Sequence, residues 1–286
     1  MLKLMRVTWA MLITAVLPGC GPVDVLNASI SLDGLTVQRD VAYRPGPRGM
    51  MDIYRPTNAA GPLPVVVFFY GGSWQTGSRG DYRFVAATLA RRGMVVVVPD
   101  YRVYPEVQFP DFIADAAEAV VAARSRAGEW GGDPKRIVLA GHSAGAHIAA
   151  MLALAPDYLA AAGGQRDQLA GMVGLAGPYD FLPITGAGIK LVFGSAVASP
   201  DTQPITFADA RSPPLLLLHG GQDTTVKPHN SINLAAAITR AGGQASVELF
   251  DSLGHIGIAS AVAPMFQFRA PVVDRIASFV AGLPPR

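Results

Sequence analysis

The sequence predicts an α/β fold in which helices flank a mostly parallel, doubly wound sheet. Two observations along the 286 residues predict it. Short, continuous apolar runs are typical of strands buried on both faces, and longer segments repeat apolar residues at steps of three and four, as helices do. The two kinds of segment alternate, which is typical of strand–helix–strand units with parallel strands. Active sites in such sheets lie at the carboxyl ends of the strands.

The expected strands begin with two short segments, residues 36–43 and 51–54, whose pattern is compatible with an antiparallel edge. Residues 65–70 then form an uninterrupted apolar run, as expected for a strand in the middle of a sheet. Further strands are expected at residues 94–98, 137–140, 172–175, 215–218 and 246–250.

The expected helices lie between and after these strands. They cover residues 81–92, 144–154, 230–241 and 272–281, with one more that Pro110 opens. We expect Gly131, Gly132 and Pro134 to end the helix opened by Pro110 before the next strand begins.

The N-terminal segment resembles an export signal. Lys3 and Arg6 precede an uncharged apolar run, residues 7–17, which is too short to span a bilayer. The sequence Leu17-Pro18-Gly19-Cys20 follows and resembles a bacterial lipobox. This resemblance implies that Cys20 is the lipidated first residue of the mature protein. The alternative is an ordinary secretory signal with a chance cysteine.

We therefore expect three parts: a signal peptide of the lipoprotein type (residues 1–19), an N-terminal tether (20–35) and an α/β domain (36–286). The protein would be exported to the cell envelope and held at the membrane by its N-terminal lipid anchor only. Cys20 is the only cysteine. No internal disulfide and no cysteine-based metal site can therefore form.

The charge balance argues against a nucleic-acid partner. The chain has 23 Lys and Arg against 21 Asp and Glu. Residues 1–19 hold two of the basic residues and no acidic one, so the rest of the chain carries 21 of each sign. No long Lys/Arg run is present, and no repeat or linker divides the domain.

The segment Gly141-His142-Ser143-Ala144-Gly145 joins an expected strand to an expected helix, which is the context of a nucleophile elbow. A strand that turns directly into a helix strains the backbone at its apex, and only glycine-sized neighbours let the chains pass so closely. Ser143 would project above the sheet at the helix N-terminus, which favours negative charge. A plain Gly/Ser-rich turn is the alternative for the pattern taken alone, and the rest of the chain favours catalysis.

A serine hydroxyl is a weak nucleophile, so a base must lie within hydrogen-bond reach and an acid must orient that base. His255 lies in a glycine-flanked loop before the final helix and fits the chain order serine, acid, histidine. Asp223 follows the strand at 215–218 and is the expected acid. Asp251 is its rival, but a role as a turn former is favoured because it lies only four residues from His255. The other histidines are His142, which we expect to point away from Ser143, and His147, His219 and His229.

Hydrogen-bond donors for an oxyanion have two sources in the sequence. One is the backbone N–H of Ala144, directly after Ser143. The other is Tyr70-Gly71-Gly72-Ser73-Trp74, at the end of a buried strand, where glycines let N–H groups turn toward a substrate. A simple glycine turn is the alternative for this second segment.

The segment from Tyr70 to Trp74 is similar to the His-Gly-Gly-Gly or His-Gly-Gly-Ala-Trp motif of α/β-hydrolase carboxylesterases. The chain resembles the branch that holds hormone-sensitive-lipase-like esterases, arylformamidases and prenylcysteine methylesterases. Further segments carry the resemblance, at residues 52–56, 99–102, 131–137 and 141–149.

This resemblance covers roughly residues 50–283 and implies an α/β-hydrolase fold. It implies Ser143 as nucleophile, His255 as base and Asp223 as acid. The implied oxyanion hole consists of the N–H groups of Gly72, Ser73 and Ala144. Tyr70 stands in place of the usual histidine and Ser73 in place of the third glycine, but neither change removes a backbone donor.

Two insertions, residues 156–168 and 181–212, are too short for a large lid, so we expect a small cap or none. Six apolar side chains are candidates to line the substrate pocket: Trp74, Tyr104, Phe181, Leu182, Ile256 and Ile258.

The sequence therefore predicts a serine carboxylesterase that hydrolyses small to medium carboxylic esters through an acyl-enzyme. No cofactor and no metal are implied. An arylformamidase or other amidase and a carbohydrate acetyl esterase remain alternatives, because leaving-group choice depends on pocket shape. The alternative from another class is a non-catalytic binding lipoprotein of the envelope, against which the intact set of site residues argues. The sequence predicts no oligomeric state.

Overall fold

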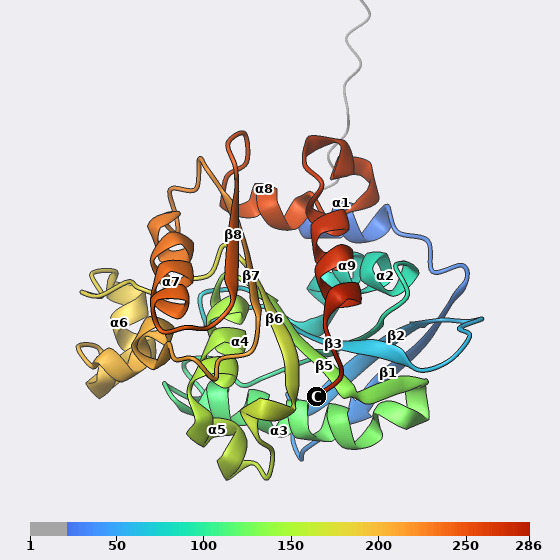
Figure 1. The fold of residues 1–286 in the computed structure, drawn as a ribbon, viewed down its shortest axis with the longest axis horizontal. Coiled ribbons are helices and arrows are strands. Elements are labelled where there is room, and N and C mark those ends of the chain that lie inside the picture. Colours follow the sequence, from blue (N-terminus) through green and yellow to red (C-terminus); the bar gives the residue numbers. More distant parts are fainter. Residues whose placement is uncertain (1–21) are drawn as a thin grey trace, which may run out of the picture.

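One eight-stranded sheet runs through the computed structural model, which describes residues 22–286 (Figure 1). The strand order is β1-β2-β4-β3-β5-β6-β7-β8. The first two strands pair antiparallel, β1 with β2 and β2 with β4, and every later neighbour is parallel. The predicted fold class, including the antiparallel edge, is confirmed.

The strands are β1 (Leu35–Ala42), β2 (Met50–Pro56), β3 (Leu63–Phe69), β4 (Val95–Pro99), β5 (Gly132–His142), β6 (Leu169–Leu175), β7 (Leu215–Gly220) and β8 (Ala245–Phe250). The α-helices are α1 (Pro22–Ala28), α2 (Arg83–Arg91), α3 (Asp111–Arg126), α4 (Ala144–Leu154), α5 (Pro156–Ala161), α6 (Ala187–Phe193), α7 (His229–Arg240), α8 (His255–Ser260) and α9 (Val272–Gly282). The 3₁₀ turns used below are η1 (Arg79–Tyr82), η2 (Ala127–Trp130) and η7 (Pro264–Arg269).

Helices cover both faces of the sheet, as the continuous apolar runs of its strands require. Helices α2 and α9 contact each other on one face, whereas α3, α4 and α5 pack together on the other (Figure 1). All residues of β4 and all but the first of β3 are buried. The segment between β6 and β7 holds α6 and short 3₁₀ turns, which form a small cap without strands.

The start of β5 differs from the prediction. Helix α3 ends at Arg126, and after η2 the left-handed residue Gly131 (φ 72°) redirects the chain. Strand β5 then begins at Gly132, which pairs with Leu63, so this glycine belongs to the strand. The pairing register shifts between Leu63 and Val65. Pro134 therefore lies in an irregular part of the strand, where its missing N–H is tolerated.

The segment predicted as a tether is partly folded onto the domain. Leu26 and Ile30 are buried. The Asn27 side chain accepts a hydrogen bond from the N–H of Phe84 (3.0 Å) and donates one to the carbonyl of Gly80 (2.9 Å). Asn27 thus satisfies an unpaired donor in the first turn of α2 from another part of the chain.

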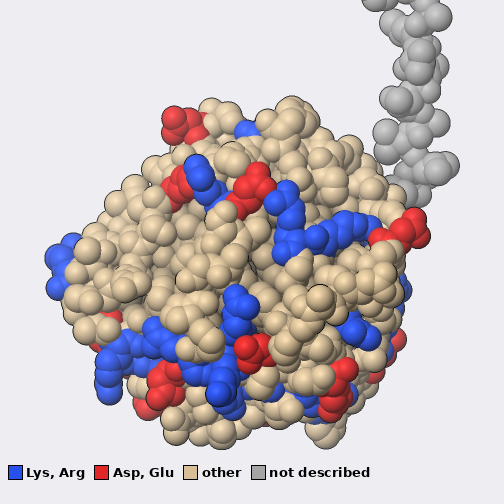
Figure 2. All heavy atoms as spheres, turned by 45° about the vertical axis from the view of Figure 1, so that its right-hand side comes forward, with Lys and Arg blue, Asp and Glu red and all other residues tan. Residues whose placement is uncertain are grey.

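Several charged side chains on the surface form ion pairs. On the face shown in Figure 2, Lys and Arg alternate with Asp and Glu instead of forming one broad basic area. Exposed ion pairs such as Arg92–Asp274 (2.6 Å) and Arg275–Glu248 (2.7 Å) follow this pattern. Within residues 22–286, no helix is long and apolar enough to cross a bilayer.

The turn from β5 into α4 is the most tightly packed backbone in the sheet region. A Cβ atom added at Gly145 would lie 2.0 Å from the carbonyl oxygen of Phe69, and one at Gly141 would lie 2.4 Å from the carbonyl carbon of Gly145. Both contacts are with backbone, which cannot move aside without shifting β3 or α4. The glycines on either side of Ser143 are therefore required by packing.

We expect Gly145→Ala to lower the free energy of unfolding by at least about 3 kcal/mol, the upper part of the usual range for overpacking. The matched control is Gly128→Ala, because a Cβ there meets nothing within 4 Å. Gly128 lies in η2, so the control should be neutral or should gain up to about 1 kcal/mol. Urea denaturation of both variants measures the difference, and equal stabilities would contradict the packing argument.

Candidate active site

Ser143 occupies the apex of the sharp turn between β5 and α4. Its backbone angles are φ 54° and ψ −121°, a conformation that L-residues rarely adopt. The turn is fixed on both sides, because the Ser143 N–H donates to the carbonyl of Leu175 (2.9 Å) and the Ser143 carbonyl accepts from the N–H of His147 (3.1 Å). The side chain therefore leaves the carboxyl edge of the sheet in one defined direction.

A chain of hydrogen bonds joins Ser143, His255 and Asp223. The Ser143 Oγ lies 2.9 Å from His255 Nε2, and His255 Nδ1 lies 2.7 Å from Asp223 Oδ2. A carboxylate only accepts, so Nδ1 carries the proton and Nε2 is free to accept the serine proton. The structure thus brings together the three residues that the sequence analysis named as nucleophile, base and acid.

Asp223 is buried, and its second oxygen is also satisfied. Asp223 Oδ1 accepts hydrogen bonds from the N–H groups of Thr225 and Val226, both at 2.9 Å. His219 Nε2 lies 3.2 Å from Asp223 Oδ2 but donates its hydrogen bond to the carbonyl of Val226 (2.9 Å). Burial lowers the pKa of His219, which favours a neutral ring beside the carboxylate. The rival acid, Asp251, lies in an exposed turn after β8.

His255 does not lie in a loop, as the sequence analysis expected, but is the first residue of the short helix α8. The preceding Gly254 is extended (φ −102°, ψ −169°) and acts as the N-cap residue. The helix fixes the backbone of His255, so its ring direction depends on α8 as well as on Asp223.

The loop after β3 reaches the pocket beside Ser143. Gly72 (φ 131°), Ser73 (φ 55°) and Trp74 (φ 58°) all have positive φ, which curls the loop at the carboxyl edge. A Cβ at Gly72 would lie 2.2 Å from the carbonyl oxygen of Thr76, so this position requires glycine. Ser73 borders the same pocket as Ser143 and Ala144. The N–H of Ala144 lies in the first turn of α4, where no intrahelical acceptor exists.

Tyr70, which replaces the usual histidine of the motif, is a fixed part of the base of this loop. Its ring stacks on Tyr101 with centroids 4.5 Å apart, and Tyr101 donates a hydrogen bond to the Tyr70 carbonyl (2.7 Å). Arg48 donates to the Tyr70 hydroxyl (3.0 Å) and to the carbonyl of Gly77 (3.1 Å). These contacts hold both ends of the loop from outside the pocket.

Arg79 forms an ionic cluster that the sequence analysis did not identify. Its guanidinium pairs with Asp52 (2.8 Å), Asp100 and Asp40. The backbone N–H of Arg79 also donates to Asp100 Oδ1 (2.8 Å). Burial opposes the charged form, but hydrogen bonding to Asp52 and the charge of Asp100 raise the pKa of Arg79 above its ordinary value. Asp52 and Asp100 lie in two of the segments that carry the family resemblance, residues 52–56 and 99–102. Acidic residues within or just after expected strands are a signal that could have predicted a nearby arginine.

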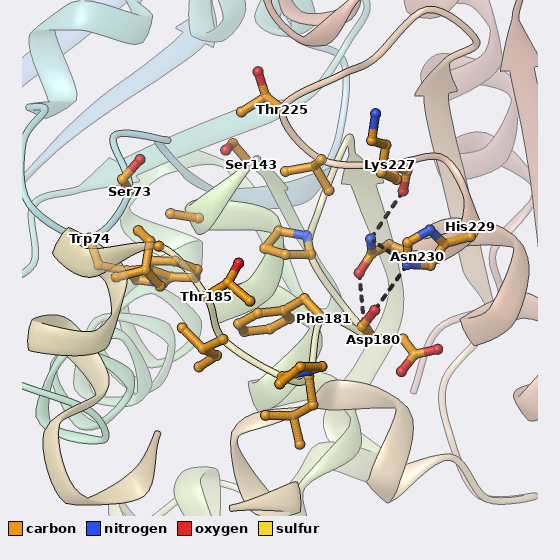
Figure 3. A pocket seen from close by; sticks show the side chains of 18 residues that line it. Ser73, Trp74, Ser143, Asp180, Phe181, Thr185, Thr225, Lys227, His229 and Asn230 are labelled. Carbon is orange, nitrogen blue, oxygen red and sulfur yellow. Dashed lines mark hydrogen bonds between the residues drawn. The ribbon is translucent and has the colours of Figure 1, made fainter. Parts of the chain in front are cut away.

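A pocket of about 470 Å³ opens beside Ser143 (Figure 3). Ser73 and Ser143 lie on one side of it and Lys227, His229 and Asn230 on the other. Its remaining wall is largely apolar and comes from the cap segment, with Phe181, Leu182, Ile184 and Ile189.

Three of the six predicted lining residues are part of this wall: Trp74, Phe181 and Leu182. Tyr104, in the loop after β4, does not line the pocket. Ile256 and Ile258 both belong to α8, where residues two positions apart lie on different faces. Ile258 is therefore buried in the core, whereas 63% of the surface of Ile256 is exposed. Gly72 does not border the pocket either.

A family model matches the part of the chain that carries most of the sheet. Residues 51–238 match the BD-FAE family model, which is more than half of the chain. The chain belongs to the BD-FAE family. Within the described part of the chain, no group of three or more His, Cys, Asp or Glu side chains could hold a metal ion.

Relatives of this member of the BD-FAE family include proteins named as esterases and one named as a formamidase. A probable isoprenylcysteine alpha-carbonyl methylesterase of Arabidopsis thaliana is 31% identical over 246 residues, which are 77% of this chain and 51% of that protein. Esterase LipC of Mycobacterium tuberculosis is 32% identical over 211 residues (66% and 52%). A kynurenine formamidase of Salmo salar is 32% identical over 145 residues (51% and 47%). The chain thus spans about half the length of these relatives.

The same fold occurs in solved structures. The apo form of Thermogutta terrifontis esterase 2 superposes with a TM-score of 0.71 at 25% sequence identity. The match covers 90% of this chain and 98% of that one. Together with the strand order, this similarity identifies the α/β-hydrolase fold that the sequence resemblance implied.

Two buried histidines near the site should make stability depend on pH. Burial lowers the pKa of His142 to about 3 and that of His147 to about 4, from an ordinary 6.5. As the pH falls below 6.5, the unfolded chain takes up these protons and the folded protein does not. The free energy of unfolding should therefore be constant with respect to these groups above pH 6.5. It should fall toward pH 4, by up to about 1.4 kcal/mol per pH unit for each histidine.

Urea denaturation between pH 7.5 and 4.5 measures this slope. His147→Gln keeps an amide donor for the carbonyl of Thr202, which His147 Nε2 contacts at 2.9 Å, but removes the titrating ring. Its slope should be shallower than that of the wild type. An identical slope would show that His147 does not contribute to acid destabilisation.

Proposed function

We propose that this protein is a serine carboxylesterase for small to medium carboxylic esters. The observation that carries the proposal is the hydrogen-bonded series Ser143–His255–Asp223, which ends on a strained serine at the edge of a pocket. The names of the relatives, two of them esterases, support it. The intact series also argues against the binding-protein alternative.

In the proposed acylation step, Ser143 Oγ attacks the ester carbonyl and gives its proton to His255 Nε2. The resulting imidazolium is stabilised by the Asp223 carboxylate, which accepts a hydrogen bond from Nδ1–H of His255. The new oxyanion accepts hydrogen bonds from the N–H groups of Ser73 and Ala144, with Gly72 as the third expected donor. His255 then protonates the leaving alcohol as the acyl–oxygen bond breaks, and the acyl group stays on Ser143.

Deacylation reverses these roles. Water replaces the alcohol, gives a proton to His255 Nε2 and attacks the acyl carbonyl. The second tetrahedral intermediate uses the same N–H donors, and its collapse returns the proton to Ser143 and releases the acid. The machinery consists of side chains and backbone alone, and every proton that His255 accepts is donated again within the cycle.

The pocket favours substrates of modest size. Its volume of about 470 Å³ lies in the lower part of the usual range for ligand pockets. Phe181, Leu182 and Ile189 offer apolar contact, while Lys227 and His229 lie at the opposite wall as polar residues. A long acyl chain would extend past the cap segment into solvent.

Arylformamidase activity is the second candidate. It is favoured by the similarity to a kynurenine formamidase over half of the chain. Attack by the same serine would cleave an activated amide, with His255 protonating the leaving aryl amine. The two activities share the nucleophile and differ only in the leaving group.

We expect the purified protein to hydrolyse p-nitrophenyl acetate and butyrate faster than the octanoate. Ser143→Ala should lower kcat by about 10⁴- to 10⁶-fold, because the nucleophile is lost. Ser125→Ala is the control, since Ser125 is exposed on α3 and should keep full activity. Faster cleavage of N-formylkynurenine than of any ester would favour the formamidase. Absence of turnover and of Ser143 labelling by a fluorophosphonate would overturn both candidates.

We further propose that Cys20 anchors the protein to a membrane of the cell envelope through an attached lipid. Cys20 and the expected signal peptide lie outside the described residues. The first described helix, α1, contacts η1, and Tyr82 of η1 contacts His142 next to the nucleophile. Helix α1, which begins two residues after Cys20, therefore packs on the same 3₁₀ turn that contacts the candidate site.

Replacing Cys20 with alanine should move the protein from the membrane fraction to the soluble fraction, because acyl chains would no longer be attached. Fractionation of cells that express each form, followed by immunoblotting, measures the shift, and incorporation of labelled fatty acid tests the modification itself. Equal membrane retention of wild type and variant would refute the lipid anchor.

A further inference from the structure

His142 lies between the nucleophile and the base, and both of its ring nitrogens have partners. It is the last residue of β5, directly before Ser143. Its Nε2 lies 3.1 Å from the backbone carbonyl oxygen of His255, and its Nδ1 lies 2.7 Å from the hydroxyl of Tyr82. The ring faces that of His255 with centroids 4.9 Å apart. The side chain was expected to point away from Ser143, and its partners in the structure are Tyr82 and His255.

The partners determine where the proton of His142 resides. A backbone carbonyl can only accept, so Nε2 must carry the proton and donate to His255. Nδ1 is then an acceptor, and the Tyr82 hydroxyl donates to it. Burial lowers the pKa of His142 to about 3, and the charge of His255 acts in the same direction. A neutral ring with this one tautomer therefore persists while His255 gains and loses protons.

Tyr82 brings the loop of the oxyanion donors into the same contact. A Cβ at Gly71 would lie 3.1 Å from both the Tyr82 hydroxyl and His142 Nδ1, so the start of that loop packs directly on the pair. Burial raises the pKa of Tyr82, which keeps its hydroxyl protonated and able to donate. Tyr82 itself is held by η1, which Arg79 ties to the ionic cluster.

We propose that Tyr82 and His142 are positioning residues for the base of the proposed esterase. The hydrogen bond from His142 fixes the first peptide of α8, and thereby keeps His255 Nε2 at 2.9 Å from Ser143 Oγ. The His255 carbonyl fixes the tautomer of His142, and Tyr82 holds the ring in place by donating to Nδ1. The pair touches the nucleophile turn, the start of α8 and the oxyanion loop, so it sets their mutual spacing. This role rests on the proposed function and adds two residues outside the triad to its machinery.

Three variants of the full-length protein test the proposal with p-nitrophenyl butyrate. His142→Leu cannot donate to the His255 carbonyl and should lower kcat by about 10- to 100-fold, because small displacements of reacting groups have effects of that size. KM should stay within about twofold of the wild-type value, since neither His142 nor Tyr82 borders the pocket. His142→Gln places an amide donor near the position of Nε2 and should restore at least a third of wild-type kcat.

Tyr82→Phe removes one oxygen atom and guards against misfolding of the His142 variants. Without the Tyr82 donor, Nδ1 of His142 loses this hydrogen bond, and the ring is no longer held in the orientation that points Nε2–H at the His255 carbonyl. We expect kcat to fall about three- to tenfold at unchanged KM. Tyr54→Phe is the control, because it removes a hydroxyl from a buried tyrosine that lies on β2, away from the site. It should keep wild-type kcat.

The outcomes separate this proposal from the function on which it rests. Active wild type with impaired His142→Leu, rescued His142→Gln and impaired Tyr82→Phe supports the positioning role. Wild-type kcat in Tyr82→Phe and His142→Leu overturns it, as does a folded His142→Gln that is as slow as His142→Leu. A wild-type protein without any turnover overturns the esterase proposal and the positioning role together.

Discussion

The close approach of two backbones, at Gly145 and Phe69, is the constraint on which the rest of the site depends. Strands β3 and β5 are parallel neighbours, and Phe69 pairs with Gly141 at their carboxyl ends. The nucleophile turn and the oxyanion loop therefore begin side by side. Because Gly145 has no side chain, α4 can start directly against β3, and the first N–H groups of the helix face the space above Ser143. A wider spacing between β3 and α4 would move Ser143 away from the loop after β3, whose N–H groups are proposed to bind the oxyanion.

Buried charge holds the loops on the same edge. Arg79 links β2 and the end of β4 to η1 through Asp52 and Asp100. Arg48 links Tyr70, at the base of the loop after β3, to Gly77 at its other end. Such groups are costly to remove from water unless every charge is paired and hydrogen-bonded. Here several carboxylates share one guanidinium, so loss of Arg79 would leave them facing one another. The N-terminal part of the domain thus contributes rigidity to a site whose reactive atoms come mostly from later strands.

The sequence was informative wherever a residue type has a single physical reason to be present. Continuous apolar runs located the buried strands, and the glycines around Ser143 located the turn that only glycine permits. Chain order singled out Asp223 and His255, which the structure places within hydrogen-bond distance of each other. Contacts between distant segments were not accessible in this way. The Asn27 side chain accepts from the N–H of Phe84 in α2, 57 residues later, and Tyr82 meets His142 across 60 residues. The overall fold, and not a local pattern, brings these residues together.

Backbone strain in this molecule is concentrated at one edge of the sheet. Ser73, Trp74, Ser143 and Ala176 have positive φ, and they follow the carboxyl ends of β3, β5 and β6. Each such residue costs roughly 1–3 kcal/mol, a substantial part of the 5–15 kcal/mol that holds a typical protein folded. The protein is therefore less stable than its architecture would allow. Thermostability and reactivity are in competition at this edge, and an engineer who wants a more durable protein should work at the amino ends of the strands.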